Sequence, residues 1–220
     1  MERNVDLNEI SDGKLYSLND MVKTGCNDCE GCSACCQGMG SSIILDPLDI
    51  HRLIINLNRS FEELLTDRIE LNVSDGIIMP NLKMGGETEK CSFLNSEGRC
   101  SIHGFRPGIC RLFPLGRLYE DNSFKYILQV HECPKAGKTK VKVKKWIDTP
   151  DLAKNEKFVN DWHYFLKDLQ AVVKSTEDES LVKNISMYVL KMFYMKPFDA
   201  SEDFYQQFED RLDEAKKTLW

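Results

Sequence analysis

Cysteine is the residue type whose number and spacing point to chemistry in this chain. Nine cysteines are present, and five of them fall in the string GCNDCEGCSACCQG: Cys26, Cys29, Cys32, Cys35 and Cys36. Thiolates at C-x2-C spacing can bind one metal ion, because a tight turn directs both sulfurs to the same side. The residues between them are mostly small or polar, which is not the composition of a core that buries inert thiols. The pattern predicts a metal site.

The spacing of the first group favours iron and leaves zinc open as the alternative. One subset, Cys26, Cys29, Cys32 and Cys36, reproduces the C-x2-C-x2-C-x3-C run of bacterial ferredoxins, although Gln37 stands where that run has proline. Neighbouring side chains usually diverge, so the adjacent pair Cys35-Cys36 suits two irons or two sites. We therefore predict an iron–sulfur cluster of the [4Fe-4S] type, with zinc as the alternative.

A second group of four cysteines is spread more widely: Cys91, Cys100, Cys110 and Cys133. Its irregular gaps do not suit paired zinc knuckles, which use two short C-x2-4-C turns. Closing long loops around an ion also costs conformational entropy that a tight turn avoids. We expect the second group to complete sites that the first group begins, so all nine cysteines are candidate metal ligands.

Charged and imidazole side chains next to the second group are candidates for supporting roles. Arg106 and Arg111 could offset the negative charge of a thiolate-bound cluster, or clamp the carboxylate of a substrate such as S-adenosylmethionine. Charge balance needs no assumption about a reaction and is preferred. His103 and His131 flank cysteines and could ligate metal or hydrogen-bond to a cluster sulfur, with an ordinary surface histidine as the competing interpretation. No residue pattern identifies a catalytic residue.

Two separated motifs together resemble a known family. The string CxxCxxCC at Cys29–Cys36 is followed by a helix entry at residues 44–50, then by C-x-F-L, C-x-I and R-P-x-x-C-R-x-F-P. This order resembles the YkgJ-type cysteine-cluster family over about residues 26–135, with Cys26 outside the shared pattern. The resemblance implies a zinc- or iron-chelating domain, often labelled an Fe–S oxidoreductase. One branch is associated with N-methylation of flagellin lysines, with an Fe–S cluster implicated.

The elements that must hold these residues are short. Asp46 and Pro47 predict a helix start, and apolar residues at helical spacing continue to about Asn58. Ser60-x-x-Glu63 is a capping box for a second helix. Hairpin turns are predicted at Asp75-Gly76 and across Glu120–Ser123, and Ser42–Leu45 as a short β-like run. The fold class is α+β: a small cysteine-rich metal-binding domain with short helices and hairpins, followed by a helical C-terminal extension.

The C-terminal part shows helical periodicity. Helix starts are predicted at Thr149-Pro150, at a Thr176-x-x-Glu179 capping box and at Ser201. Residues 135–145 hold six lysines and no acid, which is typical of a solvated edge strand whose lysines block further pairing. We predict a lead-in at 1–25, the metal-binding domain at 26–135, and a helical extension at 136–220 that packs on it.

The composition of the chain limits which cellular compartment and which binding partners we expect for it. The 220 residues carry a formal net charge of −6, which argues against nucleic acid as a partner. The most apolar stretch, Ile185–Met195, is interrupted by Lys191 and is too short for the roughly 20 residues of a membrane span. We expect a cytoplasmic protein, where thiols stay reduced and bind metal. Two classes of function are open: a redox or methyl-transfer enzyme with a protein substrate or redox partner, and a zinc-binding structural or sensory module without catalytic activity.

Overall fold

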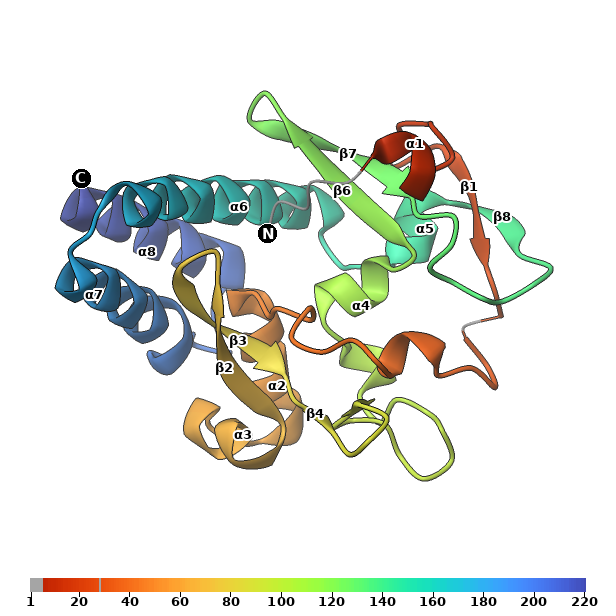
Figure 1. Cartoon of the computed structure of the whole chain (residues 1–220), viewed down its shortest axis with the longest axis horizontal. Helices are drawn as coiled ribbons and strands as arrows, with labels where there is room; N and C mark the ends of the chain where they lie inside the picture. Colours follow the sequence, from red (N-terminus) through yellow and green to blue (C-terminus); the bar gives the residue numbers. More distant parts are fainter. Residues whose placement is uncertain (1–5, 28) are drawn as a thin grey trace. The chain divides into compact units, whose positions relative to one another are not determined.

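The computed structural model describes residues 6–27 and 29–220, which combine helices with two-stranded antiparallel sheets (Figure 1). The predicted α+β class is confirmed. The chain divides into two compact units, each made of two separated segments. The cysteine unit contains the chain up to Ile43 and Met84–Leu152, and the helical unit contains Ile44–Lys83 and Ala153–Trp220. The predicted boundaries at 25/26 and 135/136 stay predictions.

The cysteine unit is built from short elements. Its helices are α1 (Leu7–Ile10), α4 (Gly108–Leu112) and α5 (Val143–Ile147), with 3-10 turns η1 (Ala34–Cys36) and η2 (His103–Phe105). Its strands are β1 (Met21–Gly25), β4 (Met84–Gly85), β5 (Lys90–Cys91), β6 (Leu115–Glu120), β7 (Ser123–Leu128) and β8 (Thr139–Lys142). They pair antiparallel as β1–β8, β4–β5 and β6–β7.

The β6–β7 hairpin confirms a turn that the sequence predicts. Its register runs from Leu115 opposite Leu128 to Glu120 opposite Ser123. The turn itself is shorter than predicted, because only Asp121 and Asn122 lie outside the strands, both with positive φ (48° and 54°). Asp and Asn tolerate this conformation, and a two-residue turn of this hand matches the twist of the strands.

The lysine-rich segment forms a strand, as predicted, but with a partner that the sequence does not indicate. β8 pairs with β1 from Met21 opposite Lys142 to Gly25 opposite Thr139 (Figure 1). Strand pairing ends at Lys142, and Lys144 and Lys145 belong to α5 instead. This pairing brings the end of β1, immediately before Cys26, beside the chain that follows Cys133.

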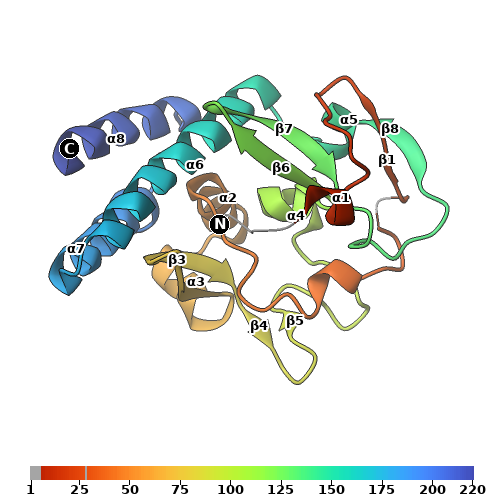
Figure 2. The same ribbon diagram turned by 45° about the horizontal axis from the view of Figure 1, so that its top comes forward.

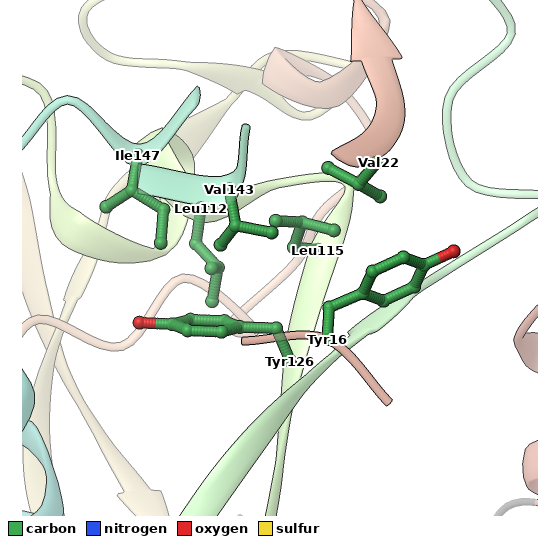
Figure 3. Packing of buried hydrophobic residues seen from close by; sticks show 7 residues of the cluster. All are labelled: Tyr16, Val22, Leu112, Leu115, Tyr126, Val143 and Ile147. Carbon is green, nitrogen blue, oxygen red and sulfur yellow. The ribbon is translucent and has the colours of Figure 1, made fainter. Parts of the chain in front are cut away.

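A small apolar core holds the cysteine unit together. Seven buried side chains from β1, β6, β7, α4, α5 and the chain before β1 form it: Tyr16, Val22, Leu112, Leu115, Tyr126, Val143 and Ile147 (Figure 3). The backbones of Tyr16 and Tyr126 exchange two hydrogen bonds of 2.8 and 3.0 Å. This core fixes β1, α4 and β8, from which the cysteine-bearing loops extend.

The helical unit begins with two short helices and a hairpin. α3 (Phe61–Asp67) carries the predicted capping box at Ser60, and α2 (Pro47–Leu57) begins at the predicted Asp46 cap, which forms a capping box with Asp49 that the sequence analysis did not predict. The β2 (Ile69–Ser74) and β3 (Ile77–Leu82) strands pair across Asp75-Gly76, as predicted. Of the predicted run Ser42–Leu45, the structure has an isolated bridge from Ile44 to Asn81 and no strand.

Three longer helices complete the helical unit. α6 (Leu152–Ser175), α7 (Glu179–Leu190) and α8 (Phe204–Leu219) are joined by a π-helical turn, η3 (Lys191–Met195), and short loops. α8 runs alongside α6 in both views (Figures 1 and 2), and the rings of Phe158 and Phe208 lie 4.6 Å apart between them. Trp162 packs against Phe193 at 4.9 Å, so aromatic contacts dominate this core.

Two predicted helix caps are wrong. Asp178, not Thr176, accepts the N-terminal hydrogen bonds of α7, from the amides of Ser180 and Leu181. Asp203, not Ser201, caps α8 by accepting from Tyr205 and Gln206. In each case a carboxylate lies closer to the first helical turn, where it also interacts favourably with the helix dipole.

No helix in the described part of the chain combines the length and the apolar character needed to cross a membrane.

Candidate metal centre

The first cysteine group lies on a loop of successive tight turns between β1 and η1. The carbonyl of Asn27 accepts from the amide of Glu30 at 3.0 Å, and that of Cys29 accepts from Cys32 at 3.1 Å. Asn27, Cys29 and Gly31 have positive φ values of 53°, 57° and 63°. This left-handed backbone is sparsely populated by residues other than glycine. The chain therefore makes the compact C-x2-C turns that metal-binding loops use.

The sulfurs of Cys26 and Cys29 are 3.5 Å apart. Two thiolates on one tetrahedral zinc ion, with Zn–S of about 2.3 Å, lie about 3.8 Å apart. The observed separation is therefore close to that of two ligands on one ion. Burial raises the pKa of the Cys29 thiol to about 12, and the neighbouring Cys26 adds to this. Without metal, the raised pKa keeps Cys29 a neutral thiol.

The adjacent pair Cys35-Cys36 lies on the 3-10 turn η1, where the Cys36 amide donates to the Ser33 carbonyl at 2.9 Å. The sequence analysis expects these two side chains to point apart. In the structure they do not, because the thiol of Cys36 hydrogen-bonds to the sulfur of Cys35. This bond lowers the pKa of Cys35 to about 7 and raises that of Cys36. Cys35 is therefore the thiolate of the pair.

The second cysteine group meets the first at this pair. Gln37 forms a β-bridge with Lys90, and the Gly38 amide donates to the Glu89 carbonyl at 3.1 Å, which aligns η1 with the strand that ends at Cys91. A turn follows Cys91, in which the Leu94 amide donates to the Cys91 carbonyl at 2.9 Å. Leu94 then forms a β-bridge with Cys100. Cys91 and Cys100 both lie close enough to raise the pKa of Cys36 electrostatically.

Arg106 supplies positive charge to these thiols. Its guanidinium donates to the His103 carbonyl at 2.8 Å and contacts the His103 ring nitrogens at 3.0 and 3.1 Å. The charge helps to lower the pKa of Cys35 and opposes the larger effect of burial, which raises the pKa of Cys100. Arg106 is therefore placed to balance thiolate charge, and His103 is held by Arg106.

Arg111 is anchored to backbone carbonyls. Its guanidinium is buried and donates to the carbonyls of Gly104 at 2.8 Å and Asp148 at 2.9 Å. It thereby joins η2 to the end of α5, while Cys110 is half-buried on α4 beside it. These bonds give Arg111 a structural role in positioning η2 and the Arg106 that follows it.

A lysine that the sequence analysis did not single out links the two cysteine groups. Lys135 donates to the carbonyl of Glu30, in the turn between Cys29 and Cys32, at 2.8 Å. Lys138 donates to the Cys133 carbonyl at 2.8 Å, which folds the intervening loop back on itself. His131 is exposed on the chain just before Cys133. A lysine-rich run gives no signal in sequence that one of its members, Lys135, bonds to a carbonyl more than a hundred residues away.

An open cavity of about 600 Å³ adjoins the first cysteine loop. Polar and small residues from that loop and from the turn before Cys100 line it: Asn27, Glu30, Gly31, Ser33, Glu97, Gly98 and Arg99. Cavities of this volume are common for small-molecule sites, although those are usually more apolar. The sequence motifs do not indicate this cavity.

The donor set fits zinc or iron, although no complete coordination sphere is formed in this structure. Across residues 6–27 and 29–220, no three His, Cys, Asp or Glu side chains converge closely enough to hold one ion. The thiols instead lie in pairs, at Cys26 with Cys29 and at Cys35 with Cys36. A soft, all-thiolate donor set of this kind selects zinc or iron–sulfur clusters over magnesium or calcium.

Comparison with known families identifies the cysteine-bearing segment. The family model CxxCxxCC, described as "Putative zinc- or iron-chelating domain", matches residues 28–146, more than half of the chain. Comparison with curated proteins finds no match, and comparison with solved structures finds none either.

Proposed function

The chain belongs to the CxxCxxCC family of zinc- or iron-chelating domains, and on that premise we propose that its cysteines hold an iron–sulfur cluster of the [4Fe-4S] type. The cluster would serve redox chemistry or cluster-assisted methyl transfer in the cytoplasm. The observation that carries the proposal is the meeting of the Cys35-Cys36 pair with Cys91 and Cys100 beside Arg106. Cys35 and Cys100, distant in sequence, both lie within electrostatic reach of Arg106, as does Cys29.

The residues around this meeting point have separate roles in the proposal. The thiolates bind the cluster, and Arg106 offsets the negative charge that they bring. Small residues such as Gly38 let the backbone approach closely, and backbone amides near sulfur tune a cluster. Bound iron–sulfur clusters supply one-electron transfer, with a potential set by charge, hydrogen bonds and exposure.

The cavity beside the first loop supports an enzyme over a passive metal module. It opens next to the Cys29–Cys32 turn and carries the cationic Arg99 with the anionic Glu30 and Glu97. A small polar co-substrate, such as S-adenosylmethionine for methyl transfer, could be held there by charge. A protein substrate or redox partner would complete the reaction. No residue is assigned as catalytic.

Metal analysis of anaerobically purified protein tests the proposal. We expect a brown protein with iron and acid-labile sulfide, and with the visible absorption of an iron–sulfur cluster. Colourless protein with stoichiometric zinc and no sulfide would overturn it.

The second candidate is a zinc-binding structural or sensory module. The 3.5 Å separation of the Cys26 and Cys29 sulfurs favours it, since this is close to the ligand spacing of tetrahedral zinc. Stoichiometric zinc in the same metal analysis, retained after purification in air, is the result expected for this function.

A further inference from the structure

Four cysteines lie on chain segments that meet at the strand that ends in Cys91. They are named here the β5-side set: Cys35, Cys36, Cys91 and Cys100. The Gln37–Lys90 bridge and the Gly38–Glu89 hydrogen bond join η1 to β5, and the Leu94–Cys100 bridge returns the chain to the same place. Cys36 interacts electrostatically with Cys35, Cys91 and Cys100. One thiol of this set thus lies near all three others.

Four other cysteines lie on chain segments that meet at the end of the β1–β8 ribbon. They are named here the β8-side set: Cys26, Cys29, Cys32 and Cys133. Gly25 lies opposite Thr139, so Cys26 follows the end of β1 beside the start of β8, the strand that the chain enters six residues after Cys133. The Lys135 bond to the Glu30 carbonyl ties that returning chain to the Cys29–Cys32 turn. Cys26 and Cys29 already have their sulfurs 3.5 Å apart.

From these contacts we infer that the cysteine unit holds two metal sites, one in each set, with Cys133 completing a site that the first loop begins. Each set supplies four thiols, which suits a tetrahedral zinc ion or an iron–sulfur cluster. The inference rests on the proposed function only in requiring that metal is bound, since either metal can fill both sites. Cys110 is assigned to neither set.

The ferredoxin-like spacing suggests a different arrangement, with Cys26, Cys29, Cys32 and Cys36 on one cluster. In the structure the Cys36 thiol has other neighbours, although Cys29 of that run lies within electrostatic reach of Cys35. Its thiol bonds to Cys35 and lies within electrostatic reach of Cys91 and Cys100, while Cys26 pairs with Cys29. We therefore assign the fourth ligand of the first loop to Cys133, because the Lys135 bond to the Glu30 carbonyl holds the segment that carries Cys133 beside this loop.

Metal content of single-cysteine variants tests the two-site arrangement. We expect Cys133→Ser to lose about half of the bound metal, Cys91→Ser to lose the other half, and the double variant to lose nearly all. Metal is counted per chain after anaerobic reconstitution of the full-length protein, for iron and zinc separately. Near-complete loss in either single variant would show one shared site, and full content in Cys133→Ser would show that Cys133 is no ligand.

A second test keeps every cysteine and so avoids variants that fail to fold. Lys135→Ala removes the bond to Glu30, and Lys140→Ala on β8 is the matched control because Lys140 is exposed. We expect metal release to EDTA in two phases, with only one phase faster in Lys135→Ala, by about tenfold as for other groups that support metal ligands. Equal acceleration of both phases, or none, would overturn the inference.

The two proposals fail in different ways. If the wild-type protein contains two zinc ions per chain and each single variant loses one of them, the iron–sulfur proposal is overturned and the two-site inference is supported. If the wild-type protein contains iron and sulfide and each single variant loses both completely, the iron–sulfur proposal is supported and the two-site inference is overturned.

Discussion

The cysteine unit and the helical unit obtain their order from different sources. The apolar cluster of the cysteine unit has seven buried side chains, and a loop of tight turns carries its first group of thiols. The helical unit packs rings of Phe158, Trp162 and Phe208 from long helices with side-chain caps. Burial of a large aromatic side chain stabilises a fold by several kcal/mol without any ligand. The comparison implies that metal contributes to folding in the first unit and not in the second.

Metal removal should produce the largest difference between the units. We expect chelation to abolish hydrogen-exchange protection in the cysteine loops, because structural metal sites contribute about 10 kcal/mol or more to folding. The α6 and α8 helices should keep their protection. Hydrogen exchange with mass spectrometry before and after chelation measures both. Protection that stays unchanged throughout residues 20–135 would show that metal is peripheral to the fold.

Truncation of a core ring should have the converse effect. Phe208 is 1% exposed and contacts Phe158, Trp162 and Phe193. Phe208→Ala should lower the free energy of unfolding of the helical unit by about 3–5 kcal/mol, because it leaves a cavity. Metal content should not change. Denaturant unfolding and metal analysis are the measurements.

The control for Phe208→Ala is Val73→Ala, at an apolar side chain that is 71% exposed on β2. We expect it to change stability by less than about 0.5 kcal/mol. A comparable loss in both variants, or a loss of metal in Phe208→Ala, would contradict the division of roles between the units.

Helix capping in the helical unit gives a smaller effect. Asp178→Ala removes the acceptor for the Ser180 and Leu181 amides and should cost about 1 kcal/mol. Thr176→Ala is the matched control, since the Thr176 hydroxyl accepts only from the Asp178 amide among these bonds. Thermal unfolding followed by circular dichroism compares them. A larger loss in Thr176→Ala would restore the capping box that the sequence predicts.

Acid should weaken the helical unit slightly through His51. The ring stacks on Phe204 at 5.2 Å, and its pKa is lowered by burial and by the positive charges of Arg52 and Arg211. The folded state therefore binds the proton less readily than the unfolded chain, whose histidine pKa is near 6.5. Stability should be full above pH 6.5 and fall as pH decreases below it.

His51→Phe keeps a ring against Phe204 and removes the titration. We expect the fall in stability below pH 6.5 to be smaller in this variant, as measured by denaturant unfolding at pH 7.5 and 5.5. An equal fall in variant and wild type would assign the acid sensitivity to other groups.

The sequence predicted most of the helix caps and turns that depend on residues close together in the chain. The Asp46 and Ser60 caps and the Asp75-Gly76 turn are confirmed because each rests on bonds between near neighbours. The Thr176 cap is wrong because α7 begins two residues later, with Asp178 accepting from the Ser180 and Leu181 amides. The β-like run at Ile44 failed because its bridge to Asn81 is not continued. Propensity does not decide between such close alternatives.

The sequence by itself determined that the chain chelates metal and which family it belongs to, because thiol chemistry and C-x2-C spacing act over a single turn. Only the tertiary structure decided which thiols are neighbours. The β-bridge between Gln37 and Lys90 brings Cys36 towards Cys91, and Lys135 bonds to Glu30, more than a hundred residues away. These contacts follow from strand pairing and from a core formed at a distance, and such long-range packing leaves no periodic pattern in the local sequence.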